Sequence, residues 1–353
     1  MTVQEPDTMA RPGVARRHFL AGMAALGASV ALPRGESRAQ PAATKPGRID
    51  VHHHLFPPTY VAEARARKAT EGIVNDWTPE KSVEDMDRAG VAVAILSLAA
   101  GGVSFVDASG LARLARECND YAAKLVADHP GRFGMFATMP LPNVEATLRE
   151  IEYAFETLKA DGVAFLTNYG DKWLGDPAFA PVMTELNRRR AVVWTHPTTA
   201  NCCRNLVPDV PPSIVEWGTD TTRTIASLVF SGTAARCPDM KVIFSHGGGT
   251  MPFLMERFVR LPLTNKNLAA RVPNGVEHEL RKFYYDTAQV ANPAPLAALL
   301  KVVPTSQIVF GTDFPYRVAM DYVKGLGSYG FSASDLGAID RDNAVRLLPR
   351  FKA

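Results

Sequence analysis

Short apolar runs alternate with longer amphipathic segments from residue 48 to the C-terminus. Eight of these runs are apolar at nearly every position, which is typical of parallel strands that are buried on both faces. The predicted strands are Arg48–Val51, Ala92–Leu98, Arg132–Thr138, Gly162–Leu166, Ala191–Thr195, Lys241–Ser245, Phe283–Thr287 and Ile308–Gly311. The predicted helices are Leu111–Asp128, Val144–Leu158, Phe179–Arg190, Thr221–Ala235, Pro295–Lys301 and Asp342–Leu348.

Eight strand–helix repeats within about 300 residues have the count and size of a closed α/β barrel of the (β/α)8 or TIM type. A doubly wound open sheet is the alternative, but it would gather its ligands at one switch point. Polar residues here follow the first, fifth, sixth and eighth strands, and these converge only if the sheet closes. We therefore predict a single-domain barrel over residues 48–353, with loops at Pro57–Pro79 and Thr198–Glu216 over its mouth.

The composition fits a globular protein large enough for this fold, because 46% of the 353 residues are hydrophobic. A net charge of +3 is too small to indicate a nucleic-acid or anionic-membrane partner. The four cysteines are too few for a disulfide scaffold. Adjacent Cys202 and Cys203 could pair in an oxidising compartment, but we do not expect this bond because the small ring is strained.

The first 39 residues are predicted to be a targeting segment. The pair Arg16-Arg17 precedes a short apolar stretch, Ala21–Leu32, and Ser37-Arg38-Ala39 has small residues at the two positions that a signal peptidase reads. The segment resembles a twin-arginine signal peptide cut after Ala39, followed by a linker over residues 40–47. The apolar stretch is too short for a stable membrane anchor. We therefore expect export to the periplasm; an uncleaved N-terminal helix is the alternative.

Residues that can bind a metal or carry a proton follow four of the predicted strands. His52 and His54 alternate at the end of the first strand, so an extended backbone turns both imidazoles to one side and His53 to the other. His196, His246 and Asp313 follow the fifth, sixth and eighth strands. Each residue alone is more often structural, but their shared position at strand ends predicts one common site.

This set resembles the metal centre of the amidohydrolase superfamily, and the resemblance covers nearly all of the chain after the leader. Two segments, Ser245–Phe253 and Gly311–Pro315, are similar to the branch that contains α-amino-β-carboxymuconate-ε-semialdehyde decarboxylase and related aromatic-acid decarboxylases. Within that branch, Arg48–His54, Pro130–Phe133 and Thr167–Leu174 are most similar to 6-methylsalicylate decarboxylase-type proteins.

The resemblance implies that His52, His54, His196 and Asp313 bind the metal. Imidazoles with one carboxylate suit a single divalent cation, with Zn²⁺ expected and Mn²⁺ as the alternative. Binuclear members add a carboxylated lysine after the fourth strand, and this chain has none there, so we predict one metal per chain. The resemblance assigns proton transfer to His246 and Asp313; a His246 that only supports a ligand is the alternative.

These residues fit two reactions. In a carboxy-lyase, a proton from His246 or Asp313 reaches the ring carbon of a small hydroxylated aromatic acid as CO₂ leaves. In a hydrolase, a metal-activated water attacks an ester, lactone or amide. The resemblance favours the lyase, with a substrate such as a salicylate derivative, and implies a homodimer. A binding or metal-storage protein is a third reading, which His246 beside Asp313 disfavours because storage needs no proton carrier.

An aromatic acid needs an apolar slot and a cation. The aromatic and arginine candidates near strand ends are Phe56, Trp173, Trp194, Phe314, Arg204, Arg223, Arg257 and Arg317. From these we select Phe56, Trp194, Arg223, Arg257 and Phe314 as the substrate-binding residues. Asp286 ends the seventh strand and could orient a ligand histidine.

Overall fold

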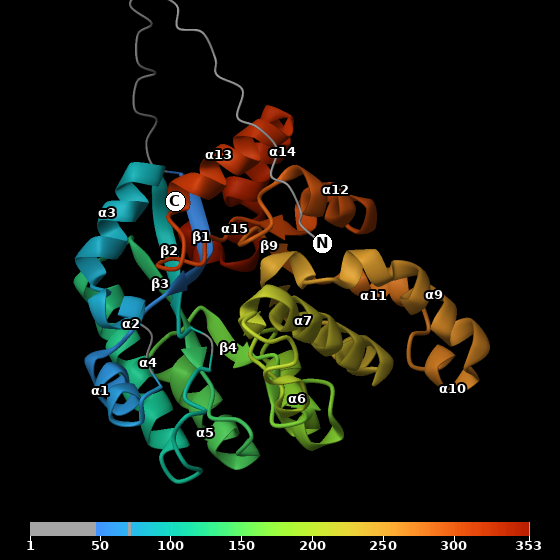
Figure 1. The fold of residues 1–353 in the computed structure, drawn as a ribbon, viewed down its shortest axis with the longest axis horizontal. Coiled ribbons are helices and arrows are strands. Elements are labelled where there is room, and N and C mark those ends of the chain that lie inside the picture. Colours follow the sequence, from blue (N-terminus) through green and yellow to red (C-terminus); the bar gives the residue numbers. More distant parts are fainter. Residues whose placement is uncertain (1–46, 70–71, 100, 353) are drawn as a thin grey trace, which may run out of the picture. The chain divides into compact units, whose positions relative to one another are not determined.

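The computed structural model describes residues 47–69, 72–99 and 101–352. Within these residues, eight parallel strands form one sheet in the order β1-β2-β3-β4-β7-β8-β9-β10 (Figure 1). The strands are β1 (Arg48–His54), β2 (Val91–Ser97), β3 (Phe133–Thr138), β4 (Gly162–Leu166), β7 (Val192–His196), β8 (Lys241–Phe244), β9 (Tyr284–Asp286) and β10 (Ile308–Val309). All eight predicted strands are confirmed. The predicted signal peptide, residues 1–39, and linker residues 40–46 lie outside the described residues.

Backbone hydrogen bonds join the first strand to the segment that follows the last. The N–H of His54 donates to the carbonyl of Phe314 at 2.8 Å, and the N–H of Asp313 donates to the carbonyl of His52 at 2.8 Å. These bonds connect the two edges of the sheet, so the strands form a near-complete ring with helices outside it (Figure 1). The arrangement is consistent with the predicted (β/α)8 barrel.

Helices cover the outer face of the ring, and the last of them packs on the side chains inside it through Ala344 and Leu347. They are α1 (Pro58–Ala66), α2 (Gly72–Asp76), α3 (Pro79–Ala89), α4 (Leu111–Asp128), α5 (Val144–Glu156), α6 (Ala180–Arg188), α7 (Pro212–Phe230), α8 (Thr233–Arg236), α9 (Met255–Thr264), α10 (Lys266–Ala269), α11 (Val276–Leu280), α12 (Pro293–Val302), α13 (Ala319–Tyr329), α14 (Ala333–Gly337) and α15 (Asn343–Leu347). A short antiparallel hairpin of β5 (Asn168–Tyr169) and β6 (Lys172–Trp173) follows β4.

Two connections predicted to be loops contain helices. The connection Pro57–Pro79 includes α1 and α2, and the connection Thr198–Glu216 ends inside α7, which begins at Pro212. Proline at the first helical position loses no intrahelical hydrogen bond, so Pro211-Pro212 starts α7 instead of marking a loop. The predicted helix start at Thr221 is therefore nine residues too late.

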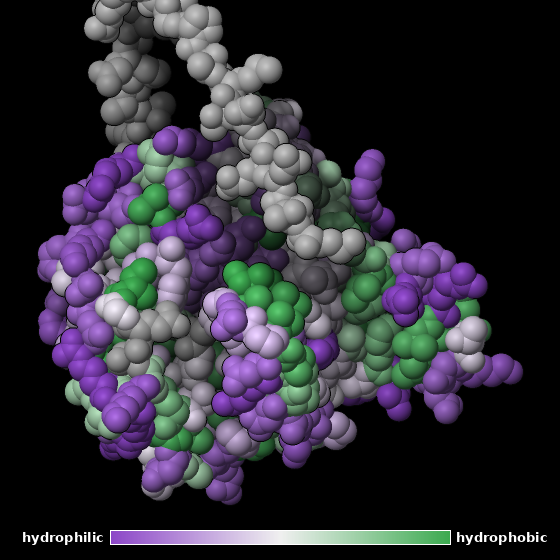
Figure 2. Space-filling model, in the orientation of Figure 1, coloured by the Kyte–Doolittle hydropathy of each residue, from purple (hydrophilic) through white to green (hydrophobic). Residues whose placement is uncertain are grey.

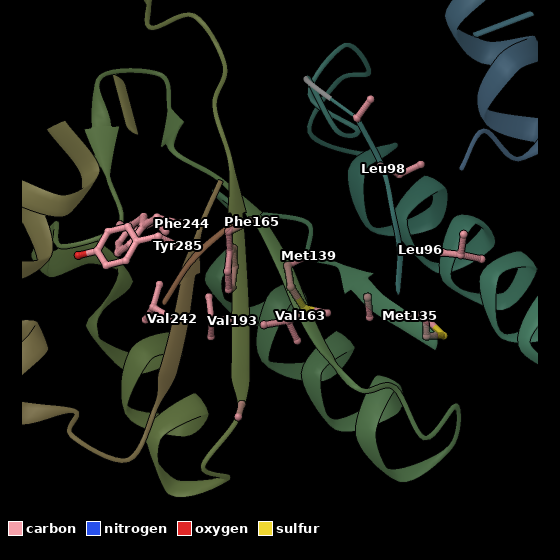
Figure 3. Close-up of a cluster of buried hydrophobic side chains, with 14 of the residues drawn as sticks. Leu96, Leu98, Met135, Met139, Val163, Phe165, Val193, Val242, Phe244 and Tyr285 are labelled. Carbon is pink, nitrogen blue, oxygen red and sulfur yellow. The ribbon is translucent and has the colours of Figure 1, made fainter. Parts of the chain in front are cut away.

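The buried side chains form two layers that follow the alternation of each strand. Side chains inside the ring include Phe136, Val192 and Trp194, and the end of the chain around Leu347 packs on the same cluster. The outer layer lies between the strands and the helices, and Figure 3 shows part of it. Val163 and Phe165 belong to the outer layer, as expected for positions two apart on one strand. This core fixes the strand ends that carry the site.

Candidate metal centre

Five polar side chains from four strand ends meet in one buried cluster. The Nε2 atoms of His52 and His54 lie 3.2 Å apart, and Asp313 Oδ1 lies 3.2 Å from the first and 2.9 Å from the second. His196 Nε2 is 4.0 Å from the same oxygen, and His246 Nε2 is 3.4 Å from Asp313 Oδ2. One ligand atom each from His52, His196, His246 and Asp313 lie within 4.8 Å of one another, a set that could hold a metal ion. The structure thus brings the predicted residues together.

A β-bulge in β1 decides which way its imidazoles point. The register with β2 shifts between Asp50 and His53, because these residues, three apart, pair with positions two apart on β2. Val51 lies in the inner core cluster, and strict alternation after it would turn His52 outward. The extra residue resets the alternation, so His52 and His54 face the centre. His53 faces away, as predicted, and its Nδ1 contacts Asp50 Oδ2 at 3.0 Å.

The three imidazoles predicted to be ligands are each held through Nδ1. The Nδ1 contacts are His52 to Asp286 Oδ2 at 2.8 Å, His54 to the Ser97 carbonyl at 3.3 Å and His196 to the Pro197 carbonyl at 2.9 Å. These partners only accept hydrogen bonds, so Nδ1 carries a proton, and each ring in its neutral form can present the lone pair of Nε2 to the centre. This donor set fits a divalent cation.

Asp286, the last residue of β9, connects several parts of the site. Its Oδ2 accepts from His52 Nδ1 and from Trp194 Nε1 at 3.3 Å, and its Oδ1 accepts the backbone N–H groups of His246 at 2.9 Å and Ala288 at 3.1 Å. The carboxylate is fully buried. The prediction that Asp286 orients a ligand histidine agrees with this geometry.

Charges inside the cluster shift its protonation in the metal-free protein. Burial lowers the pKa of His52, but the carboxylates of Asp286 and Asp313 outweigh burial and raise it to about 10. Burial lowers the pKa of His54, and burial with the neighbouring imidazoles lowers that of His196 well below its ordinary value. Burial raises the pKa of Asp313, but charged His52 and hydrogen bonds from the histidines hold it well below its ordinary value. Without metal, one proton therefore sits on His52 between two carboxylates.

Two residues of the cluster have left-handed backbones. His246 has φ 53° and Asp313 has φ 63°, a region that non-glycine residues rarely occupy outside constrained sites. Gly247, Gly248 and Gly249 continue the left-handed turn after His246. A Cβ on Gly249 would come within 2.0 Å of the Gly218 carbonyl of α7, so only glycine allows this close packing.

A narrow apolar pocket of about 20 Å³ opens beside the cluster, with Trp194 and His196 in its wall. Its other lining residues come mainly from the ends of β2, β3 and β4 and are Leu98, Ala99, Gly102, Val103, Ser104, Thr138, Met139, Leu141, Ala164, Phe165, Leu166 and Tyr169. A more polar pocket of about 250 Å³ adjoins it, since both share Leu141, Leu166 and Tyr169, and it includes Arg204. The apolar lining suits a small aromatic molecule.

Of the five predicted substrate-binding residues, one lies beside the cluster and four lie elsewhere. Trp194 lies beside the cluster, with its ring centroid 4.7 Å from that of His52. Phe56 is buried against Tyr60 and Trp77, and Phe314 stacks on the outward-facing His53 at 4.7 Å. Arg223 lies on α7 with Nη1 3.7 Å from Asp220 Oδ1, and Arg257 is exposed on α9. Of these five side chains, Trp194 is the one placed against a histidine of the cluster.

The position after β4 is occupied by Thr167, not by lysine. Its hydroxyl donates to Asp220 of α7, and the same carboxylate accepts from Asn168 Nδ2 at 2.6 Å and Trp173 Nε1 at 2.8 Å. These bonds anchor the β5–β6 hairpin on α7. Trp173, considered for the substrate slot, instead serves this network.

The structure contains one bond that we did not expect and one contact that we did not predict. The structure pairs Cys202 with Cys203, which we did not expect from the strain of the ring. Gln289, which no sequence signal singled out, donates from Nε2 to Asp313 Oδ2 at 2.9 Å. An isolated glutamine after a strand has no motif, so only the fold could reveal this contact.

The chain is similar to known proteins in sequence and in fold. Residues 49–350 match the family model described as amidohydrolase. The chain is 42% identical over 328 residues to decarboxylase yanB of Aspergillus niger, covering 86% of this chain and 88% of that protein. It is 36% identical over 315 residues to the 6-methylsalicylic acid decarboxylase of Penicillium expansum, covering 86% and 97%. The solved structure of 5-carboxyvanillate decarboxylase from Novosphingobium aromaticivorans with bound manganese has a TM-score of 0.76 at 19% identity, covering 87% and 97%, a likeness of fold.

Proposed function

The chain belongs to the amidohydrolase family, and we propose that it is a metal-dependent, non-oxidative decarboxylase of a small hydroxylated aromatic acid such as a salicylate derivative. One observation carries this proposal: imidazole Nε2 atoms and the Asp313 carboxylate converge beside an apolar pocket that adjoins a larger, more polar one. The decarboxylase relatives at 36–42% identity support the same reaction class.

We assign metal binding to His52, His54, His196 and Asp313. The first three present Nε2 with Nδ1 already engaged, and Asp313 Oδ1 faces all three. A divalent cation bound there would polarise the acid or an adjacent phenolic oxygen of the substrate. Nitrogen and oxygen donors of this kind suit Zn²⁺, with Mn²⁺ as the alternative, and we propose one ion per chain.

His246 and Asp313 would handle the proton that replaces the carboxyl group. Decarboxylation breaks the bond between the ring carbon and the carboxylate, CO₂ leaves, and the ring carbon gains one proton. His246 Nε2 lies 3.4 Å from Asp313 Oδ2, so a proton can be transferred between the imidazole and the carboxylate. His246 is also the least buried of the four imidazoles, at 9% exposed, which suits contact with substrate.

Product identification tests the proposal. Purified protein loaded with Zn²⁺ or Mn²⁺ is incubated with salicylate, 6-methylsalicylate, 2,6-dihydroxybenzoate and aryl esters. We expect a phenol and CO₂ from at least one acid, whereas an acid and an alcohol from an ester would instead identify a hydrolase. The control His246→Ala should keep its metal and lose turnover.

We propose export by the twin-arginine route to the periplasm, supported by the Arg16-Arg17 pair and the Ser37-Arg38-Ala39 motif. N-terminal sequencing of protein from the periplasmic fraction should give Gln40 as the first residue. An Arg16→Lys/Arg17→Lys variant should accumulate uncleaved. Among the described residues, none of the helices has the length and apolar character needed to cross a membrane.

We also propose a homodimer, by analogy with the family. Supporting this, exposed apolar side chains cluster in the sequence before and at the start of α7, at Leu206, Val207, Val210, Ile214 and Val215. Figure 2 shows hydrophobic residues grouped on the face around α7. Apolar surface of this kind often marks an interface. Light scattering coupled to size exclusion measures the mass, and a monomer would refute the proposal.

A further inference from the structure

The two oxygens of Asp313 have separate sets of neighbours. Oδ1 lies near the Nε2 atoms of His52, His54 and His196, at 3.2, 2.9 and 4.0 Å. Oδ2 lies 3.4 Å from His246 Nε2 and accepts a hydrogen bond of 2.9 Å from Gln289 Nε2. The carboxylate therefore has Oδ1 toward three imidazoles and Oδ2 toward His246 and Gln289.

The backbone fixes the place of the Gln289 amide. Gln289 has φ 59°, in the left-handed region, and its N–H donates to the hydroxyl of Tyr322 on α13 at 3.2 Å. Tyr322 is 4% exposed, so this anchor lies in the core. The backbone of Gln289 is thus constrained at a position from which the side chain contacts Asp313 Oδ2.

The segment that carries Gln289 also holds the other parts of the site. Asp286 binds His52 Nδ1 and the backbone of His246, and the Thr287 hydroxyl donates to the Gly311 carbonyl at 3.0 Å while accepting the Gly311 N–H at 2.9 Å. Residues 286–289 therefore contact β1, the turn after β8 and the segment that leads to Asp313. Gln289 is the member of this segment that touches the carboxylate itself.

We propose that Gln289 is a positioning residue for Asp313, an inference that rests on the function proposed above. A carboxylate only accepts hydrogen bonds, so the amide NH₂ faces Oδ2 and keeps that oxygen turned away from His52, His54 and His196. Oδ1 is then the one oxygen presented to a cation, and Oδ2 stays beside His246 for the proton. Without Gln289, the carboxylate is free to rotate and offer both oxygens to the cation.

The Gln289→Met variant tests this role, because it keeps the length of the side chain and removes the donor. We expect kcat for the best aromatic acid to fall about tenfold while KM stays within about twofold, the pattern of a displaced catalytic group. We also expect a changed visible absorption spectrum for the Co²⁺-substituted protein, since that spectrum follows the number and arrangement of ligand atoms. This second readout needs no substrate.

Gln307→Met is the matched control. Gln307 lies at the opposite end of the same strands, where Nε2 donates to the carbonyls of Arg281 at 2.6 Å and Phe283 at 3.1 Å. It should leave kcat and the Co²⁺ spectrum unchanged. A Gln289→Met protein with the wild-type kcat and spectrum, a rise in KM alone, or equal losses in both variants would overturn the inference. If the wild type decarboxylates no acid, the proposed function fails, and the Co²⁺ spectra still decide the role of Gln289.

Discussion

The four imidazoles of the cluster separate into two kinds by what holds their rings. His52, His54 and His196 are fixed through Nδ1 by a carboxylate or a carbonyl. The ring of His246 contacts Asp313 through Nε2, and in the described part of the chain no such partner holds its Nδ1. A ring whose Nδ1 is hydrogen-bonded to a fixed acceptor is suited to bind a cation through Nε2. A ring whose Nδ1 has no such acceptor can gain or lose a proton there. This difference supports His246 as proton carrier.

Removing a ligand and removing the proton carrier should have different effects. We expect His52→Ala and Asp313→Ala to lose both bound metal and activity, because a three-ligand remnant binds weakly. His246→Ala should retain about one metal ion per chain with activity reduced at least about hundredfold. Metal analysis by mass spectrometry and initial rates provide the comparison. Stoichiometric metal in a His52→Ala/His54→Ala double variant would contradict the assigned site.

Metal binding to the metal-free protein should release a proton from His52. The pKa of His52 rises from 6.5 to about 10, so its charged form stabilises the metal-free fold fully below pH 6.5, and this stabilisation is lost as the pH rises through about 10. A cation requires the neutral ring, so its apparent affinity should increase with pH across this window. Calorimetry at pH 7.5 in two buffers of different ionisation enthalpy should report about one released proton. Identical heats in both buffers would contradict this charge state.

The convergence of these histidines could be predicted from sequence, but the reason that they point inward could not. The spacing of His52 and His54 places them on one side of a strand. Which side they take depends on the bulge between Asp50 and His53, and a bulge arises from pairing with another strand. The contact of Gln289 likewise depends on a left-handed backbone anchored by Tyr322. Both features belong to the fold rather than to a local pattern.

At the scale of single elements, the packing of β10 against β1 and β9 leaves no room for a side chain at Gly311. An added Cβ would lie 2.9 Å from the Cβ atoms of His52 and Asp286. Gly311→Ala should therefore push β1 and β9 away from this position. We expect it to lower the free energy of unfolding by about 1–3 kcal/mol and to weaken metal binding. Thermal unfolding and metal titration measure the two effects.

Gly327→Ala is the matched control for Gly311→Ala. Gly327 is exposed within α13, and nothing lies within 4 Å of an added Cβ. Alanine there should leave metal binding unchanged and increase stability by up to about 1 kcal/mol, because alanine favours a helix. If both variants lose metal equally, steric pressure at Gly311 is not the cause.

Strands were easier to predict than the helices that follow them. Buried parallel strands are continuous apolar runs, so all eight were found, and α4 was predicted with its observed bounds. Helices α1 and α2 are short and lie in a connection without a clear apolar face. The start of α7 was missed because Pro211 and Pro212 are also typical of loops. Short helices of this kind are stabilised by the core on which they pack, which a local pattern does not contain.

For the whole molecule, the site is held by hydrogen bonds that do not involve a cation. Metal removal should therefore lower the melting temperature without unfolding the barrel. At free metal about a hundredfold above Kd, binding contributes about 2.7 kcal/mol, which corresponds to a loss of roughly 3–6 °C on chelation. Calorimetry and circular dichroism with and without EDTA test this. A loss of helical signal on chelation would show that the cation is required for folding.

The bonds that join β1 to the segment after β10 also set the order in which the site can be assembled. His54 and Asp313 are separated by 259 residues yet lie in direct contact. A ribosome therefore releases both β1 histidines long before their carboxylate exists, and no incomplete chain can present the full ligand set. A site that contains all four proposed ligands can therefore form only after Asp313 has been synthesised.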